Sequence, residues 1–280
     1  MPEASSRRSR SPSTWRPARP DLVPVLPRPR KRFGQHFLTD RHYLARIVEA
    51  IDPRPDDAML EIGPGTGILT AELARVVERL QVVEIDRDLA AALRERFPPE
   101  RVQVLEGDAL ELDLETLPAE LRVVGNLPYN VSTPILFRIA AHAERVRDCV
   151  FMLQKEVVDR MVAAPASADY GRLSVMLQYR FAMELALTVP AGAFTPPPKV
   201  ESAVVRMRPL GARRPRAEDE GLFAAVVASA FSQRRKTLRN AAKAFVPARA
   251  YEAAGIDPGR RGETLSVAEF IALADAARMN

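Results

Sequence analysis

The chain has 280 residues, of which 47% are hydrophobic, and its net charge is +5. No apolar run approaches the roughly 18 residues needed to cross a membrane, and the beginning lacks the apolar core of a secretion signal. A cytoplasmic protein with one large domain or two modest domains is therefore expected. The charge is uneven, because the first 32 residues hold nine of the 41 basic residues and only two of the 36 acidic ones.

Residues 1–30 are rich in proline, serine and arginine and show no periodicity. Such a segment buries too little apolar area to fold, so we expect a disordered basic tail. Two alternatives remain open: a loose nucleic-acid tether and a mitochondrial transit peptide. The prolines of this segment argue against an amphipathic targeting helix.

The next part of the chain alternates between strand and helix patterns. Thr39 or Asp40 can cap a first helix, whose apolar positions follow i, i+3, i+4, i+7 at Leu44, Ile47, Val48 and Ile51. Buried strands are predicted at 58–62, 80–86, 102–110, 121–129 and 147–153. Helices are predicted between them at 68–80 and 88–97, from Pro134 with Thr133 as its cap, and at 154–163. This alternation indicates a parallel, doubly wound α/β sheet.

The pattern changes near residue 182. Strands are predicted at 183–190 and 200–208, on either side of the loop AGAFTPPPK. A polar linker at 211–220 is then followed by helices alone, at 221–231, 234–245 and 266–277. Ser266 and Glu269 have the spacing of a capping box for the last helix. We therefore predict a sheet domain over 31–210 and a small all-helical C-terminal domain over 211–280.

Cysteine and histidine do not suggest a metal site. The single cysteine, Cys149, lies in the apolar run CVFML and is expected in a buried strand. The three histidines, at 36, 42 and 142, lack the spacing of metal ligands. We expect a metal-free protein.

A glycine loop, EIGPGTG at 61–67, joins the first buried strand to a helix. Glycines there let backbone amides approach a ligand closely. The dinucleotide fingerprint is G-x-G-x-x-G, whereas this loop has G-x-G-x-G at Gly63, Gly65 and Gly67, with Glu61 two residues ahead. A carboxylate does not favour a pyrophosphate but does favour an amino group. The loop therefore indicates a cationic nucleoside, S-adenosylmethionine, rather than NAD.

Two further acids end the second and third strands. Glu84 can accept hydrogen bonds from both ribose hydroxyls, and Asp108 from an adenine amino group. The carboxyl ends of parallel strands meet at one rim, where open α/β sheets bind ligands. A Rossmann-like, S-adenosylmethionine-dependent methyltransferase fold is therefore predicted.

The stretch VVGNLPYNVSTPI ends the fourth strand at the same rim. The Asn126 side-chain oxygen and the carbonyl of Leu127 or Pro128 can hold the two hydrogens of an exocyclic amine, whose lone pair then faces the methyl sulfonium. Tyr129 can stack on the base and hold it out of its helix. Proline makes this turn rigid, so much of the rate would come from positioning.

The chain resembles the ribosomal RNA adenine dimethyltransferases, most closely those acting on the bacterial small subunit. The resemblance covers residues 31–275 and rests on EIGPGTG and NLPYNVSTPI together with GQHFL, VVEID, EGDAL, MLQKEV, YGRLSV, FTPPPKVESAV, FSQRRKTLRN and ETLSVAEF. It implies transfer of two methyl groups to each of two adjacent adenines near the 3′ end of small-subunit (16S) rRNA, with a role in subunit biogenesis. The implied partner is the assembling small ribosomal subunit, and a monomer is expected.

The resemblance also assigns roles to residues. It implies cofactor contacts from the segment GQHFL, at Gln35, His36 and Leu38, where many relatives carry asparagine at the position of His36. The cofactor-binding residues that match the family without departure are Gly63, Gly65, Glu84, Asp108 and Asn126. Phe194 is a candidate for another wall of the base pocket.

The predicted RNA surface is a cluster of basic residues. Arg234, Arg235, Lys236 and Arg239 lie within six residues, and Arg235 and Arg239 have the i, i+4 spacing of one helix face, which suits phosphate contacts. A second, weaker group is Arg213, Arg214 and Arg216.

Three other functions compete with this prediction. A large-subunit rRNA methyltransferase of the antibiotic-resistance type shares the glycine loop and NLPY, but FTPPPKV and FSQRRKTLRN favour the small-subunit type. An RNA-binding assembly factor on a retained methyltransferase fold would have degenerate cofactor motifs, and these are intact. The third alternative, an NAD oxidoreductase, is disfavoured by the glycine spacing and by NLPY.

Overall fold

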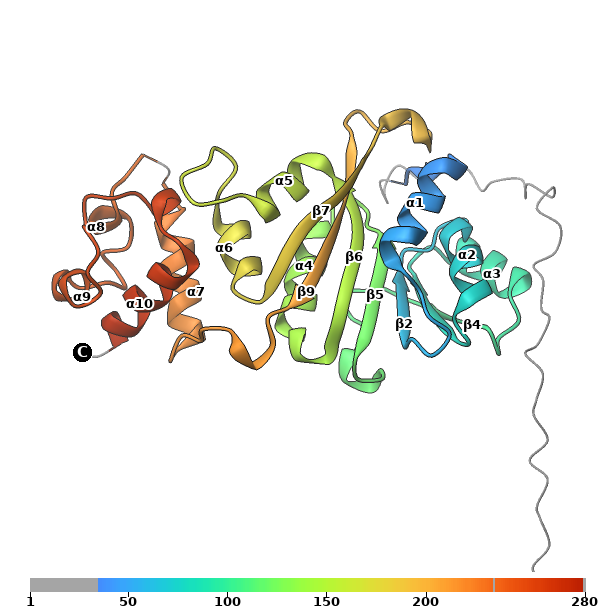
Figure 1. The fold of residues 1–280 in the computed structure, drawn as a ribbon, viewed down its shortest axis with the longest axis horizontal. Coiled ribbons are helices and arrows are strands. Elements are labelled where there is room, and N and C mark those ends of the chain that lie inside the picture. Colours follow the sequence, from blue (N-terminus) through green and yellow to red (C-terminus); the bar gives the residue numbers. More distant parts are fainter. Residues whose placement is uncertain (1–34, 234, 279–280) are drawn as a thin grey trace, which may run out of the picture.

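The computed structural model describes residues 35–233 and 235–278. The predicted tail at 1–30 and Arg234 lie outside the described residues. Figure 1 shows a sheet with helices packed against it and a group of C-terminal helices, α7 to α10, at one end of the molecule.

One seven-stranded sheet forms the centre, in the order β4-β3-β2-β5-β6-β9-β7. Its five strands from β4 to β6 are parallel, and at one edge β9 pairs antiparallel with β6 while β7 pairs antiparallel with β9. The bounds are β2 (Met59–Ile62), β3 (Leu80–Glu84), β4 (Val102–Glu106), β5 (Leu121–Asn126), β6 (Val146–Gln154), β7 (Phe181–Val189) and β9 (Ser202–Pro209). A separate two-residue ladder joins β1 (Phe37–Leu38) to β8 (Phe194–Thr195).

Ten α-helices accompany these strands in the described part of the chain. Their bounds are α1 (Arg41–Ile51), α2 (Ile68–Val76), α3 (Arg87–Arg96), α4 (Ser132–Ala141), α5 (Lys155–Val162), α6 (Arg172–Gln178), α7 (Glu220–Ala230), α8 (Leu238–Ala241), α9 (Ala248–Ala253) and α10 (Val267–Arg278). Short 3-10 turns lie at Leu114–Thr116, Ala143–Arg145, Ala191–Ala193, Gly211–Arg213 and Gly262–Thr264.

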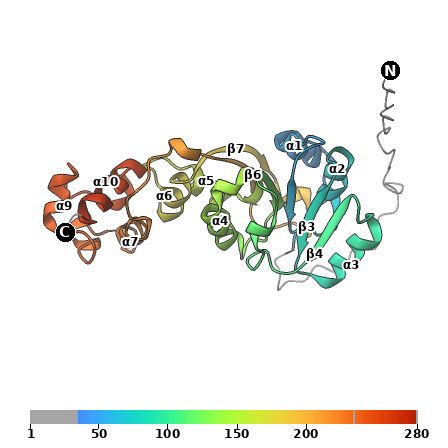
Figure 2. The same cartoon turned by 90° about the horizontal axis from the view of Figure 1, so that it is seen from below.

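The two faces of the sheet have separate apolar cores. Successive side chains of a strand point to opposite faces, so Val123 of β5 packs with α4 and α5, whereas its neighbour Val124 packs with α1 and α2. Figure 2 shows α1 and α2 on one side of the sheet and α4 on the other. Burial on both faces explains the nearly continuous apolar strands of the sequence.

A third apolar core holds the C-terminal helices together. It gathers Phe223 of α7, Leu238 of α8 and Phe270 of α10, and it also takes in Val175 and Tyr179 from the α6 region. This core therefore draws side chains from both sides of the predicted boundary at residue 210. The division into domains stays a prediction.

A buried arginine anchors α1 to the end of the sheet remote from the carboxyl strand ends. Arg122 of β5 is 5% exposed and pairs with Asp57 at 2.6 Å and with both oxygens of Asp148 at 2.8 and 2.9 Å. It also donates to the carbonyls of Ile51 and Asp52, at the end of α1. A buried charge needs such partners, and these fix the helix that carries Ile47 toward the sheet.

Of three predicted helix starts, two agree with the structure and one differs. Asp40 caps α1, as one of the two predicted alternatives, and the Ser266–Glu269 capping box is present. Thr133, however, does not cap α4, which begins at Ser132 with Val131 as its N-cap. The amide of Val131 donates to the Pro128 carbonyl, and this turn starts the helix before Thr133.

The predicted helix at 234–245 is also wrong. The described residues form only the four-residue α8, because Thr237 is extended, with φ −69° and ψ 159°. The amides of Leu238 and Arg239 donate to the carbonyls of Arg260 and Pro258 instead of to a preceding helical turn. Arg235 and Arg239 therefore do not share a helix face.

Candidate active site

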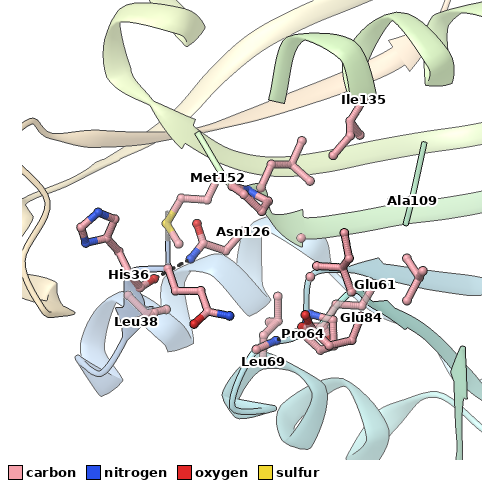
Figure 3. A pocket seen from close by; sticks show the side chains of 18 of the residues that line it. His36, Leu38, Glu61, Pro64, Leu69, Glu84, Ala109, Asn126, Ile135 and Met152 are labelled. Atoms are coloured by element: carbon pink, nitrogen blue, oxygen red, sulfur yellow. Dashed lines mark hydrogen bonds between the residues drawn. The ribbon is translucent and has the colours of Figure 1, made fainter. Parts of the chain in front are cut away.

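A pocket lies at the carboxyl ends of β2, β3, β4 and β5, and the segment 35–38 forms part of its wall. The predicted cofactor and catalytic residues all line it: Gln35, His36, Leu38, Glu61, Gly63, Gly65, Glu84, Asp108, Asn126, Pro128 and Tyr129. Figure 3 shows Asn126 and His36 toward one side of the pocket and Glu61 and Glu84 toward the other.

Two buried carboxyls dominate one side of the pocket. Glu61 is 1% exposed, and burial raises its pKa to about 8, although the Thr70 hydroxyl donates to it at 2.7 Å and opposes the shift. Glu84 is 4% exposed, and burial also raises its pKa. Because these two carboxyls are almost completely shielded from water, they favour a ligand that is cationic or that donates hydrogen bonds.

Glu84 also organises the glycine loop. One of its oxygens accepts from the Gly65 amide at 3.0 Å, and the other accepts from the Asp86 amide at 2.9 Å. Gly63 and Gly65 both have positive φ, +67° and +58°, which explains why glycine stands at each. A carboxylate has about four acceptor positions, so Glu84 keeps capacity for a ligand.

The third strand end adds Asp108 and an apolar wall. One oxygen of Asp108 accepts from the Leu110 amide at 2.9 Å, and the residue lines the pocket. Ile85 also lines it and is 44% exposed, which is unusual for a large apolar side chain beside two acids. Ile85 therefore offers an exposed apolar surface at the polar rim of the pocket, against which the flat face of a ring can pack.

Asn126 is held in one orientation by the segment 35–38. Its Nδ2 donates to the His36 carbonyl at 3.2 Å, drawn as the dashed line in Figure 3. A carbonyl can only accept a hydrogen bond, so the Asn126 side chain must turn its nitrogen toward the His36 carbonyl. Its oxygen then points away from that carbonyl. The Asn126 side-chain oxygen thus remains an acceptor for a ligand. Gly125, just before it, must be glycine, because a Cβ there would lie 2.3 Å from the Ile62 carbonyl oxygen.

The carbonyls after Asn126 are not equivalent. The Pro128 carbonyl accepts from the Val131 amide at 3.1 Å. Leu127 donates its amide to Met152, but its carbonyl receives no hydrogen bond from another residue in the described ranges. Of the two acceptors that the sequence left open, Leu127 is therefore the better one.

Tyr129 is half-buried beside these acceptors. Its hydroxyl lies 2.7 Å from the Ser202 hydroxyl, and its ring stacks on His36 with a centroid distance of 5.7 Å and an interplanar angle of 27°. His36 Nδ1 is 2.9 Å from the Pro196 carbonyl. The His36 side chain thus lies with Tyr129 rather than with the acids.

Phe194, the predicted further wall of the base pocket, lies behind this pocket in the structure, and its role at the base stays a prediction. It is 3% exposed, it belongs to the core beneath α1, and it is not among the lining residues. Its backbone pairs with Leu38, so it holds the segment 35–38 against the sheet. The Ala193 carbonyl accepts from the Thr39 and Asp40 amides at the start of α1, and the Phe194 ring is buried in the apolar core there.

The predicted basic surface is only partly preserved. Arg235, Lys236 and Arg239 are exposed, the first two in the turn before α8 and Arg239 within α8. Arg214 is not available, because its side chain is 7% exposed, pairs with Glu220 at 2.8 Å and lies over the Tyr179 ring. Arg216 is exposed.

Sequence reasoning missed three pocket features: the Thr70 support of Glu61, the Ile85 wall and the Ser202 contact with Tyr129. Ile85 alone carried a sequence signal, as an apolar residue between two acids in VVEID. Nothing in the described residues groups three or more His, Cys, Asp or Glu side chains as a metal site. Nor is any described helix long and apolar enough to cross a membrane.

The fold and this pocket together define an α/β methyltransferase of the Rossmann-like class. Residues 27–278 match the family model described as "Ribosomal RNA adenine dimethylase". The chain belongs to this family and is an rRNA adenine methyltransferase.

Curated relatives and solved structures agree with that membership. The chain is 58% identical over 246 residues to "Ribosomal RNA small subunit methyltransferase A" of Aromatoleum aromaticum, covering 88% of this chain and 93% of the relative. The protein of the same name from Laribacter hongkongensis is 57% identical, with coverage of 88% and 95%.

Two crystal structures share the fold. A dimethyladenosine transferase from Plasmodium falciparum has 25% identity and a TM-score of 0.72, covering 85% of this chain and 96% of that one. The 23S rRNA methyltransferase ErmE has 28% identity and a TM-score of 0.67, with coverage of 86% and 99%.

Proposed function

We propose that the protein transfers methyl groups from S-adenosylmethionine to the 6-amino groups of two adjacent adenines near the 3′ end of small-subunit rRNA. The observation that carries this proposal is the fixed Asn126 amide, whose oxygen and the Leu127 carbonyl form a pair of acceptors at the pocket. The high identity to relatives named for the small subunit supports the choice of RNA.

The acid side of the pocket suits the cofactor. The proposal places the amino group of the methionine part near Glu61, the ribose hydroxyls at Glu84, and the adenine amino group at Asp108. The glycine loop and the segment 35–38, with Gln35 and Leu38, enclose the ligand. When bound, S-adenosylmethionine supplies a methyl group activated by a positively charged sulfur.

The Asn126 side supplies positioning rather than a strong base. The adenine amine has two hydrogens, one for the Asn126 oxygen and one for the Leu127 carbonyl. Holding both hydrogens turns the nitrogen toward a tetrahedral geometry and aims its lone pair across the pocket. Tyr129 stacks on the base, which must leave its helix to enter. The amine becomes cationic on methylation, so its proton can leave afterwards.

A separate group of residues, outside the pocket, supports binding to the ribosomal particle. Arg235, Lys236 and Arg239 are exposed cations that can contact RNA phosphates without reading the bases. A role in small-subunit biogenesis, action as a monomer and a cytoplasmic location remain parts of this proposal.

The first experiment measures transfer of labelled methyl from S-adenosylmethionine to purified small subunits that lack the modification, with large subunits alongside. We expect label in small-subunit RNA, recovered as dimethyladenine. Heat-denatured enzyme provides the blank, and S-adenosylmethionine binding is measured on the same preparation.

A second candidate is methylation of large-subunit RNA, which the likeness to ErmE favours. Label confined to large-subunit RNA would move the protein to that branch. Label in neither subunit, with S-adenosylmethionine still bound, would make an assembly factor the leading function.

A further inference from the structure

Ser202 is a buried hydroxyl beside the pocket that the proposed mechanism does not use. It begins β9 and is 0% exposed, and the two residues that follow it, Ala203 and Val204, are also fully buried and apolar. A hydroxyl in such surroundings costs free energy unless it is hydrogen-bonded. Its partner is the Tyr129 hydroxyl, at 2.7 Å.

The backbone of Ser202 is paired with a strand on each side. In register it lies between Gln154 of β6 and Val189 of β7, so strands on both sides hold its backbone. A serine has a single side-chain torsion between this backbone and its oxygen. The oxygen is therefore a rigid reference point next to the pocket.

Tyr129, in contrast, lies on the turn between β5 and α4. Its carbonyl accepts from the Ser132 hydroxyl at 3.2 Å, which holds the backbone but leaves the ring free to rotate. The ring direction is set by the hydroxyl contact at its far end and by the His36 ring on its face. His36 is in turn held by Pro196, so both supports come from the segment 196–202.

We propose that Ser202 is a positioning residue for methyl transfer: its hydroxyl fixes the ring plane of Tyr129, on which the target adenine stacks. Ser202 itself touches neither base nor methyl donor. This inference rests on the proposed function and gives the segment after Phe194 a role at the site.

The test compares Ser202→Ala, Tyr129→Phe and the double variant in methyl transfer to small subunits lacking the modification, at saturating S-adenosylmethionine. Each single variant removes one partner of the same contact, so we expect each to lower kcat by about tenfold. The kcat of the double variant should be no lower than that of the slower single variant, because the first substitution already removes the hydrogen bond between the two hydroxyls. S-adenosylmethionine affinity should stay at the wild-type value.

Ser174→Ala is the matched control. Ser174 of α6 is also 0% exposed, and its hydroxyl donates to the Arg160 carbonyl, away from the pocket. It should lower the melting temperature and leave kcat unchanged. The proposal would be overturned if Ser202→Ala also lowered only the melting temperature and left kcat unchanged. It would equally be overturned if the kcat losses of the two single variants multiplied in the double variant.

Two results distinguish a failure of this proposal from a failure of the proposed function. If Ser202→Ala does not fold, Tyr129→Phe alone decides, because wild-type kcat in that folded variant contradicts a positioning role for the contact. If the wild-type protein methylates no small subunits, the proposed function fails instead. Wild-type methylation with unaffected variants leaves that function standing and removes only the role of Ser202.

Discussion

The two sides of the pocket are built in different ways. On the acid side, Glu61 is the next-to-last residue of β2, Glu84 is the last residue of β3 and Asp108 lies two residues after β4. The glycine loop contacts Glu84 through the Gly65 amide, 19 residues away. On the amide side, Asn126 is oriented by a carbonyl 90 residues away and Tyr129 by a hydroxyl 73 residues away. The proposed function thus makes cofactor binding depend on the strand ends and the loops beside them, and base positioning depend on distant segments brought together.

Asn126→Ala tests this division with the largest expected effect. It removes the fixed acceptor, and we expect methyl transfer to fall by about a thousandfold, as for loss of one preorganised polar group in other enzymes. S-adenosylmethionine binding should weaken only moderately, because the acids remain. Labelled-methyl transfer and calorimetric binding measure the two quantities, and full activity in a variant that binds the cofactor normally would refute the amine-holding role.

Glu84→Gln should have the opposite effect, a large loss of S-adenosylmethionine affinity with little loss of kcat. The side-chain amide of this variant keeps the shape of the carboxylate but places an NH2 group opposite the backbone NH of Gly65 or of Asp86. One of these two hydrogen bonds is therefore lost, which weakens both the glycine loop and the proposed ribose site. We expect S-adenosylmethionine affinity to fall by about a hundredfold, with kcat largely kept at saturating cofactor. Glu95→Gln, an exposed change on α3, is the control; equal loss of kcat and affinity would contradict the division.

The acid side should also make cofactor affinity depend on pH. Burial raises the pKa of Glu61 to about 8, so below that pH the empty pocket holds a neutral acid, which must lose its proton to pair with an amino group. Affinity should therefore rise with pH up to about 8 and then level off, with a slope of at most about tenfold per pH unit. Titration calorimetry between pH 6 and 9 provides the measurement.

Thr70→Val sharpens that test. The hydroxyl of Thr70 stabilises the ionised form of Glu61, and its loss should shift the rise in affinity to higher pH. A flat profile in the wild type, or an unshifted one in the variant, would show that Glu61 does not pair with the cofactor.

The exposed cations should have the smallest effects. Lys236→Ala and Arg239→Ala each remove one phosphate contact, so subunit binding should weaken a few-fold at about 0.15 M salt, with a shallower salt dependence. Arg75→Ala on α2, where Arg75 pairs with Glu72, is the control. Unchanged affinity and salt slope in both variants would remove this surface from the proposal.

Much of the sheet and the acid side could be predicted from the sequence. Parallel strands show as buried apolar runs, and their carboxyl ends share one rim, so acids at those ends must lie near each other. The helix at 234–245 could not be excluded in this way, because its residues have ordinary helical propensity. The contacts of Leu238 and Arg239 with the carbonyls of Arg260 and Pro258 replaced that helix.

By itself, the sequence determined the order of strands and helices, the glycine loop, the acid rim and the Asn126 turn, because each depends on neighbours along the chain. Only the tertiary structure decided the orientation of the Asn126 amide, the support of Tyr129 by Ser202, the burial of Phe194 and the pairing of Arg214 with Glu220. These features depend on which distant segments meet. Local propensity and periodicity do not carry that information, and packing supplies it when the two faces of the sheet are covered.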